Sequence, residues 1–365
     1  MAVKIVPFTP QLSGAVRDFN RRLRAAGAAD DLGFPEPPDP GWMPGMELFV
    51  AVEGAGDVVR GGYILRQQRF WFGGVAHEVA HYRLPLSEGL IDRAYAMLGL
   101  RLVRDALVRQ PRLYALGMGA WDKPLPQMLK RMGWRMCAVP FYFKVVHPFR
   151  FLRNLRALRT SAPRRLVMDL AAFSGAGWLG VKALGFTRRG AEDRVSWSAV
   201  NRQREIVPDF ADWTDEIWQR CRSAYAMLAL RDAPTLERLY PASDARFLRL
   251  RTPRGWAVLL DTSMSGHKQF GDMHVGTIAD CLARPEDAPE VIGAAAHLLE
   301  TRGVDLVISN QRHASWSSAL REAGFRRGPS NFLLALSPEM AACTGPAADG
   351  QFHINRGDGD GPIHL

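Results

Sequence analysis

The chain has 365 residues, 47% of them hydrophobic and 23% charged, and a formal net charge of +10 at pH 7. This composition predicts an ordinary globular protein, and a usual domain size of about 150 residues predicts two domains. No uncharged apolar run reaches about 18 residues and the N-terminus lacks a signal peptide's apolar core, so we expect a soluble, cytoplasmic protein. The four cysteines form no CxxC pair, which predicts reduced thiols, no metal site and no disulfide framework.

The first part of the chain alternates strand patterns with one helix pattern. Apolar alternation predicts strands at residues 3–8, 48–52 and 59–66. The spacing of Val16, Phe19 and Leu23 predicts a helix after the first strand. Residues 34–44 contain too many prolines for regular structure, and we interpret them as an ordered loop and a candidate substrate lid.

Residues 77–134 read as strand, loop, helix, strand and helix. Apolar residues over 98–107 follow a helical stripe, which Pro111 ends. A short buried strand is predicted over 113–116, followed by a helix over 123–133 that ends at a glycine. This order predicts a parallel β-α-β crossover.

Arginines dominate the middle of the chain. Between residues 147 and 204 basic residues far outnumber acidic ones, and the run FRFLRNLRALR predicts a basic amphipathic helix. Three interpretations stay open for this segment: a solvated helical linker, a contact with an anionic membrane surface, or a contact with nucleic acid.

The C-terminal half repeats the order of the first half, which indicates an internal duplication. Its expected strands are 206–210, 246–251, 256–261, 273–282, 305–309 and 331–336, and its expected helices are 215–230, 233–240, 290–301 and 313–323. We predict an N-terminal domain over 1–147, a basic helical linker over 148–204, a C-terminal domain over 205–338 and a tail over 339–365. The tail is either flexible or folds back into the cleft between the domains, with Asp358 and Asp360 binding an amine or a sugar hydroxyl.

Several pieces of the two halves follow one family pattern: HYRLPLSEG, DRAYAMLGLRLVRDAL and LYALGMG in the first half, and HVGTIADCLA and ALREAGF in the second. On these pieces each half resembles an acyltransferase of the GNAT superfamily. The resemblance covers nearly the whole chain except the linker and the tail. It implies an α/β (α+β) fold of two GNAT-like lobes, each a mixed, mostly antiparallel twisted sheet flanked by helices.

In that superfamily the central strand splays from its neighbour, a pantetheine arm pairs with the exposed backbone, and the pyrophosphate lies on the next helix N-terminus. The resemblance therefore implies acetyl-CoA or another acyl-CoA as co-substrate. We expect it in the first half, because Glu286, Asp287 and Glu290 stand where phosphate would bind in the second. The expected cofactor-binding residues are Leu84, Leu86, Arg93, Tyr95 and Gly99.

Acyl transfer to an amine needs a base for the ammonium proton and an acid for the departing thiolate. Glu78 is the expected base and His81 the alternative, because both lie on the central strand of the first half, where Tyr82 shares a face with Glu78. Many relatives place an acid tyrosine four residues before the glycine after the last helix, and this chain has leucine at both such positions. Tyr95 or water can substitute for it.

The second half carries the expected acceptor-binding residues, which are His274, Asp280, Asn310, His313 and Trp316. The predicted function is an N-acyltransferase that acylates an amine of a small molecule, amino sugar or amino acid. Two alternatives stay open: a Fem-type aminoacyl-tRNA-dependent transferase, which the basic linker suits, and a catalytically silent GNAT-like binding protein. The expected partner is a small-molecule amine, with the inner membrane surface as an option for the linker and nucleic acid only as tRNA in the alternative.

Overall fold

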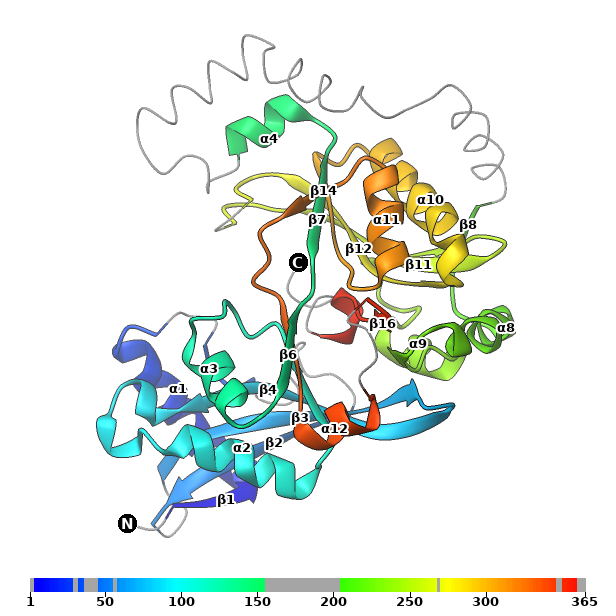
Figure 1. Ribbon diagram of the computed structural model, residues 1–365. Coiled ribbons are helices and arrows are strands. Elements are labelled where there is room, and N and C mark those ends of the chain that lie inside the picture. Colours follow the sequence, from blue (N-terminus) through cyan, green and yellow to red (C-terminus); the bar gives the residue numbers. More distant parts are fainter. Residues whose placement is uncertain are drawn as a thin grey trace. The chain divides into compact units, whose positions relative to one another are not determined.

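A computed structural model describes residues 3–28, 32–35, 45–54, 58–154, 204–267, 270–345 and 350–359. The chain divides into two compact units (Figure 1), unit 1 with Met1–Cys137 and Asn331–Ala347 and unit 2 with Ala138–Ser330 and Ala348–Leu365. Most of the candidate lid, residues 36–44, and most of the basic linker, residues 155–203, lie outside the described residues. The described start of the linker is a helix, α4 (Pro148–Asn154).

Unit 1 is a mixed sheet with helices on both faces. Its strands are β1 (Val3–Pro7), β2 (Met46–Glu53), β3 (Val58–Phe72), β4 (Val75–Ser87), β5 (Leu113–Leu116), β6 (Arg135–Ala138) and β15 (Leu333–Leu336). Its helices are α1 (Ser13–Ala25), α2 (Leu98–Arg109), α3 (Pro124–Arg131) and α12 (Pro338–Cys343). The sheet order is β1-β2-β3-β4-β5-β15-β6, in which β4 and β5 pair in parallel while β1 to β4 and β5 to β15 pair antiparallel.

The core of unit 1 follows from the apolar stripe of α2. Leu102 and Val103 are fully buried and pack in one cluster with Tyr63 of β3 and residues of β4 and β5. On the other face of the sheet, Phe19 of α1 stacks on Phe34 with ring centroids 5.5 Å apart. The predicted helix over 98–107 and the parallel crossover are therefore confirmed.

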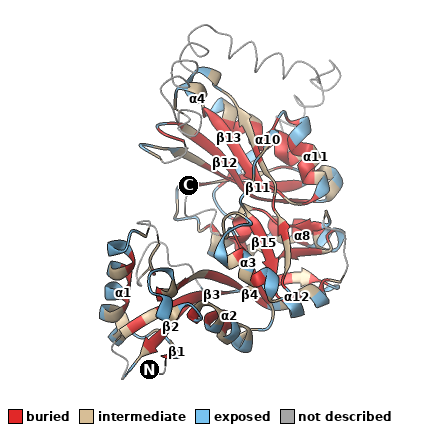
Figure 2. Cartoon of the chain, turned by 60° about the vertical axis from the view of Figure 1, so that its left-hand side comes forward, coloured by how far each residue is buried: buried red, intermediate tan, exposed pale blue. Residues whose placement is uncertain are grey.

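Unit 2 is a second mixed sheet with order β14-β7-β13-β12-β11-β10-β8. Its strands are β7 (Phe141–Val145), β8 (Glu205–Val207), β10 (Phe247–Arg251), β11 (Gly255–Ser263), β12 (His274–Ala283), β13 (Leu306–Asn310) and β14 (Arg326–Gly328). Unit 2 also contains β9 (Met227–Ala229) and β16 (Phe352–His353), which pair with each other in parallel outside this sheet. Its further helices are α8 (Asp212–Cys221), α9 (Ala233–Leu239), α10 (Ala288–Thr301) and α11 (Ala314–Glu322). Within the main sheet β12 and β13 pair in parallel and the other pairs are antiparallel. Figure 2 shows buried residues concentrated along the strands of the sheets.

The two sheets exchange one strand each. β7 precedes the linker in the chain, yet it lies between β13 and β14 in unit 2. β15 comes from the C-terminal half, yet it pairs with β5 in unit 1. Phe141 and Phe143 of β7 pack on the unit 2 cluster that contains Phe270 and Met273, so the apolar face of β7 contributes to the core of unit 2. A linear boundary at residue 147 therefore does not separate the strands of the two sheets.

The exchange predicts which unit a core substitution weakens. Leu334 of β15 is fully buried and pairs with Leu116 of β5, so Leu334→Ala removes apolar contacts in unit 1 and is expected to cost about 2–5 kcal/mol. Hydrogen exchange read by mass spectrometry should accelerate at the β5 amides while β12 stays protected. The control is Val108→Ala, at a side chain 84% exposed, with an expected effect within about 0.5 kcal/mol. Faster exchange confined to β12 would contradict the assignment of β15.

Candidate functional site

The central strand of unit 1 is bulged near its C-terminal end. β3 pairs Gly62 with Leu86 but Ile64 with Arg83, so a single β3 residue faces Leu84 and Pro85 of β4 together. Leu84 has a φ of 44°, in the left-handed region that side-chain-bearing residues rarely adopt. A bulge of this kind leaves the extra residue outside the ladder and bends the strand.

Beside this bulge β4 and β5 separate. Their parallel pairing consists of Ala80 with Leu113 and His81 with Tyr114, although β4 continues to Ser87. No strand of the described chain lies between them in the sheet. Backbone N–H and C=O groups need partners, so the part of β4 that follows His81 offers an edge to which an extended ligand can bond.

An ion-pair network holds the connection from β4 to α2. The carboxylate of Glu88 is buried and accepts from Arg22 and Arg60, each at 2.8 Å. Arg60 also pairs with Glu53 at 2.8 Å, and the Tyr95 hydroxyl donates to Glu53 at 2.9 Å. Hydrogen bonds from Tyr95 and Arg60 lower the pKa of Glu53 below its usual value. The connection is therefore held by ion pairs and a hydrogen bond to α1, β2 and β3.

The five expected cofactor-binding residues all lie on this segment. Leu84 is at the bulge and Leu86 is buried directly after it. Arg93 is exposed, and Tyr95 belongs to the ion-pair network. Gly99 lies in the first turn of α2, where a Cβ would meet no atom within 4 Å. The first N–H groups of a helix lack intrahelical partners and favour an anion.

His81 lies at the last residue pair before the strands separate. It is 1% exposed and stacks on Tyr114 with ring centroids 4.6 Å apart. Burial, with the nearby cations of Arg66 and Arg83, holds the pKa of His81 well below its usual value. Its Nδ1 has no hydrogen-bond partner among the described residues. The imidazole is therefore neutral at neutral pH, the form that can accept a proton.

The other two expected catalytic residues lie elsewhere. Tyr82 is buried on the face toward α2, 5.3 Å from the ring of Tyr63, and burial raises its pKa well above the usual value. Glu78 is exposed, pairs in register with Arg69, and lies about 10 Å along β4 from His81 at the usual rise of a strand. The structure thus does not bring Glu78, His81 and Tyr82 together.

The expected acceptor-binding residues of unit 2 bond within the unit. The Asp280 carboxylate is 1% exposed and accepts from Arg231 at 2.9 Å and from Tyr240 at 2.8 Å. The buried Trp316 donates from Nε1 to Tyr225 at 2.9 Å. These side chains have partners without any ligand.

The remaining three follow the same pattern. The Nδ1 atom of His313 accepts from the Ser315 amide and so caps α11, while burial lowers the pKa of His313 to about 4. Asn310 is 3% exposed and its Oδ1 accepts from Arg356 at 3.2 Å. His274 pairs with Asp261.

The central strand of unit 2 repeats the bulge. β11 pairs Val258 with Asp280 but Leu259 with Ile278, which leaves Ala279 as the extra residue. The pairing of β12 with β13 ends at Ile278 and Ser309. The two central strands therefore share one construction.

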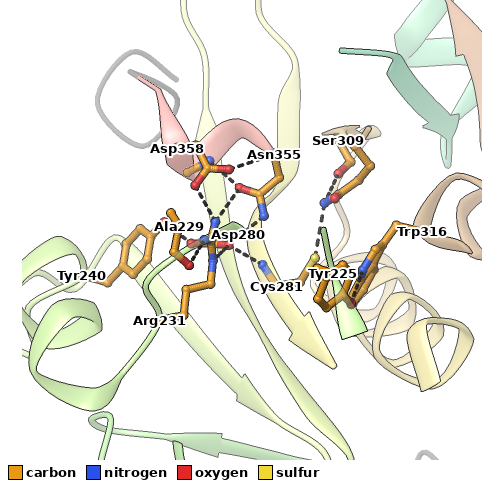
Figure 3. A network of polar contacts seen from close by, with 12 residues as sticks. Tyr225, Ala229, Arg231, Tyr240, Asp280, Cys281, Ser309, Trp316, Asn355 and Asp358 are labelled. Carbon is orange, nitrogen blue, oxygen red and sulfur yellow. Dashed lines mark hydrogen bonds and ion pairs between the residues drawn. The ribbon is translucent and has the colours of Figure 1, made fainter. Parts of the chain in front are cut away.

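In unit 2 the C-terminal segment lies in the opening beyond these pairs (Figure 3). Asn355 donates to Asp280 of β12 at 2.7 Å and forms a bridge with Gln311, which follows β13. Asp358 is 2% exposed and pairs with Arg231 at 2.7 Å. The sequence left open whether this tail is flexible or folded back, and Asp358 lies in the interior of unit 2. Asp360 is outside the described residues.

Sequence reasoning missed Arg231 and Asn355, which hold this segment. Their only signal was an arginine after the apolar run of residues 227–230 and an asparagine three residues before Asp358, a spacing that here forms a capping box. The described residues contain no group of His, Cys, Asp and Glu that could hold a metal ion. None of the described helices is long and apolar enough to cross a membrane.

Comparison with known proteins adds evidence at the level of the fold. No protein-family model matches the chain, and no curated protein does. A conserved protein of Enterococcus faecalis V583, described as a probable N-acyltransferase, has a TM-score of 0.54 and 7% identity, over 93% of this chain and 74% of that one. A GCN5-related N-acetyltransferase from Anabaena variabilis has a TM-score of 0.52 and 9% identity, over 94% and 74%.

The structure of N-myristoyltransferase from Saccharomyces cerevisiae with bound myristoyl-CoA has a TM-score of 0.50 and 10% identity, over 92% of this chain and 79% of that one. These likenesses show that the chain has the fold of the GNAT superfamily. Both predicted features of the fold class, mixed and mostly antiparallel sheets with flanking helices, are confirmed.

The lowered pKa of His81 predicts how stability depends on pH. The unfolded chain binds a proton near pH 6.5 and the folded chain does not, so stability falls as pH drops below that value. Between pH 7.5 and 5.5 the wild type should lose about 1.4 kcal/mol relative to His81→Leu, since a leucine binds no proton. Urea unfolding of both proteins at the two pH values measures this difference. Parallel pH profiles would show that His81 is protonated in the folded chain.

Proposed function

We propose that the chain is an N-acyltransferase that moves an acyl group from an acyl-CoA to an amine of a small molecule, amino sugar or amino acid. The observation that carries this proposal is the bulged β4, which separates from β5 after His81 and leads through residues 88–97 to the N-terminus of α2. The described functions of the similar structures support it, since one is a probable N-acyltransferase and another is an enzyme with bound myristoyl-CoA.

Acyl-CoA would bind in unit 1. Its extended amide chain would pair with the backbone of β4 around Leu84 and Leu86, and its phosphates would lie against Arg93 and the first turn of α2 at Gly99. Unit 2 is less suited to phosphate. Two acidic residues directly before α10 pair there with exposed arginines, Glu286 with Arg284 at 2.7 Å and Asp287 with Arg254 at 2.9 Å. The opening of unit 2 also contains the C-terminal segment.

In the reaction the amine nitrogen attacks the thioester carbonyl carbon, and the carbon–sulfur bond breaks to release the thiolate. The amine loses one proton and the thiolate gains one, so the products are an amide and free CoA. We propose His81 as the group that takes the amine proton, because it ends the paired part of β4 and its imidazole is neutral, although its lowered pKa makes it a weaker base than an exposed histidine. Backbone N–H groups freed at the bulge would bind the oxyanion.

Several assignments stay predictions. The acceptor-binding role of His274, Asp280, Asn310, His313 and Trp316 is one, and contact of the basic linker with a membrane surface is another. A catalytically silent binding protein remains the second candidate, favoured by the burial of His81 and by the leucines at the expected acid-tyrosine positions. Binding of acyl-CoA without turnover on any amine would favour it, and binding of charged tRNA alone would favour the Fem-type alternative.

Calorimetric titration with acetyl-CoA and longer acyl-CoAs tests the cofactor. Arg93→Ala should weaken binding about tenfold, because an exposed guanidinium next to a helix N-terminus is expected to pair with phosphate. The matched control is Arg104→Ala, an exposed arginine further along α2, which should bind like the wild type. If the wild-type chain binds no CoA ester, the proposed function is wrong.

The proton acceptor is tested by paired substitutions on β4. His81→Gln should lower turnover by about 10²–10⁴-fold with little change in acyl-CoA affinity, since general base catalysis has that range. Glu78→Gln should keep wild-type turnover, because Glu78 lies about 10 Å along the strand from the paired end of β4. A reversed result, with Glu78→Gln inactive and His81→Gln active, would restore Glu78 as the base.

A further inference from the structure

The C-terminal segment, residues 350–358, contacts unit 2 as a peptide ligand would. The amide of Arg312 donates to the Ile354 carbonyl and the amide of Ala314 to the Gly350 carbonyl, both at 3.0 Å. On its other side the segment pairs in parallel with β9, through Phe352 and His353. Backbone groups of unit 2 thus bond to the segment from both sides, which is how a sheet edge binds a peptide.

Side chains that line the opening of unit 2 determine which residues a bound peptide must have at two positions. Arg231 is 1% exposed and donates to Asp358 at 2.7 Å, so it binds an acidic residue (Figure 3). One residue earlier, Gly357 lies against Asp280 so closely that an added Cβ would be 2.8 Å from Asp280 Oδ2 and would also clash with Tyr240 Oη. The opening therefore selects glycine directly before an acidic residue, in the 3-10 turn that Arg356–Asp358 forms.

Unit 2 does not need Asp358 to neutralise its buried charge. Arg231 already pairs with Asp280 at 2.9 Å, so the carboxylate of Asp358 makes the cluster net negative. Burial raises the pKa of Asp358, and the neighbouring carboxylate of Asp280 raises it further, while burial lowers the pKa of Arg356 to about 10. Without the segment, Arg231 and Asp280 would still form an ion pair in which one buried cation is matched by one buried anion.

The segment also carries polar groups that docking leaves without partners. His353 is fully buried, and neither ring nitrogen has a hydrogen-bond partner among the described residues. Burying such groups costs free energy that an ordinary core residue would not impose. Phe352 and Ile354, both fully buried, supply the opposing apolar contribution. The stability of the docked segment is thus the difference between the gain from burying Phe352 and Ile354 and the cost of burying the unpaired ring nitrogens of His353.

We propose that the opening of unit 2 is a binding site for a peptide that pairs along β9 and ends in a Gly-Asp turn, which the chain's own residues 350–358 occupy as an internal, releasable ligand. The site is distinct from the acyl-CoA site proposed for unit 1, and it does not depend on acyl transfer. Its elements are the diverging strands β12 and β13, the edge of β9, and Arg231 as the anion-binding residue.

The test uses a fluorescent peptide of residues 350–359 and the full-length chain. In the wild type the tethered segment should exclude the peptide, because a short tether gives it a local concentration of about millimolar. Gly357→Ala should weaken the tethered segment through the clash with Tyr240 and Asp280, and should therefore bind the peptide. The matched control is Gly350→Ala, where an added Cβ makes an ordinary 3.5 Å contact with Ala314, and it should exclude the peptide as the wild type does.

A peptide with asparagine at the Asp358 position should bind Gly357→Ala at least about tenfold more weakly, since it lacks the charge for Arg231. A folded Gly357→Ala that binds neither peptide overturns the proposal.

Hydrogen exchange of the wild-type chain tests the proposal without that variant. The amides of Arg312 and Ala314 should exchange by local opening, ahead of the β12–β13 ladder. If they exchange only with global unfolding, the segment is a fixed part of the core and the proposal is wrong.

Discussion

The backbone pairing between β4 and β5 stops after His81 and Tyr114, and the rest of unit 1 is arranged around that interruption. A leucine in the left-handed region costs about 1–2 kcal/mol, so the surrounding structure has to hold Leu84 there. Glycines in β3 make this arrangement possible. A Cβ at Gly61 would lie 2.6 Å from the Leu86 carbonyl, so only glycine lets β3 approach the bulged strand this closely. The bulge thus depends on a neighbouring strand as well as on its own sequence.

The two units share this construction but differ in the charge of the following loop. In unit 1 the buried Glu88 is matched by Arg22 and Arg60, and removing either arginine would leave a buried carboxylate with fewer donors. In unit 2 the corresponding loop carries Glu286 and Asp287. The two loops therefore differ both in length, ten residues between β4 and α2 against four between β12 and α10, and in the charges that they carry.

Local patterns in the sequence were sufficient for much of the fold. The apolar stripe of residues 98–107 and the glycine after residue 132 predicted α2 and the end of α3, because helix periodicity and caps are set by neighbouring residues. The exchange of β7 and β15 could not be predicted, because it depends on which distant core covers an apolar strand face. His81 shows the same limit at the site. Alternation placed it on a strand face, but its burial depends on Arg66, Arg83 and Tyr114 around it.

A strand that separates from its neighbour leaves donors and acceptors that need partners, and the two units satisfy this requirement in different ways. Unit 2 bonds to its own chain through Asn355, whose side chain reaches Asp280 and whose backbone reaches Gln311. The strands of unit 1 offer no such segment between β4 and β5 in the described chain. A ligand that pairs along β4 would therefore gain bonds that unit 1 does not supply itself, whereas a ligand for unit 2 has to displace bonds already made. Unit 1 thus has an opening between β4 and β5 that no described strand fills, whereas the opening beyond the β12–β13 pairs in unit 2 contains residues of the C-terminal segment.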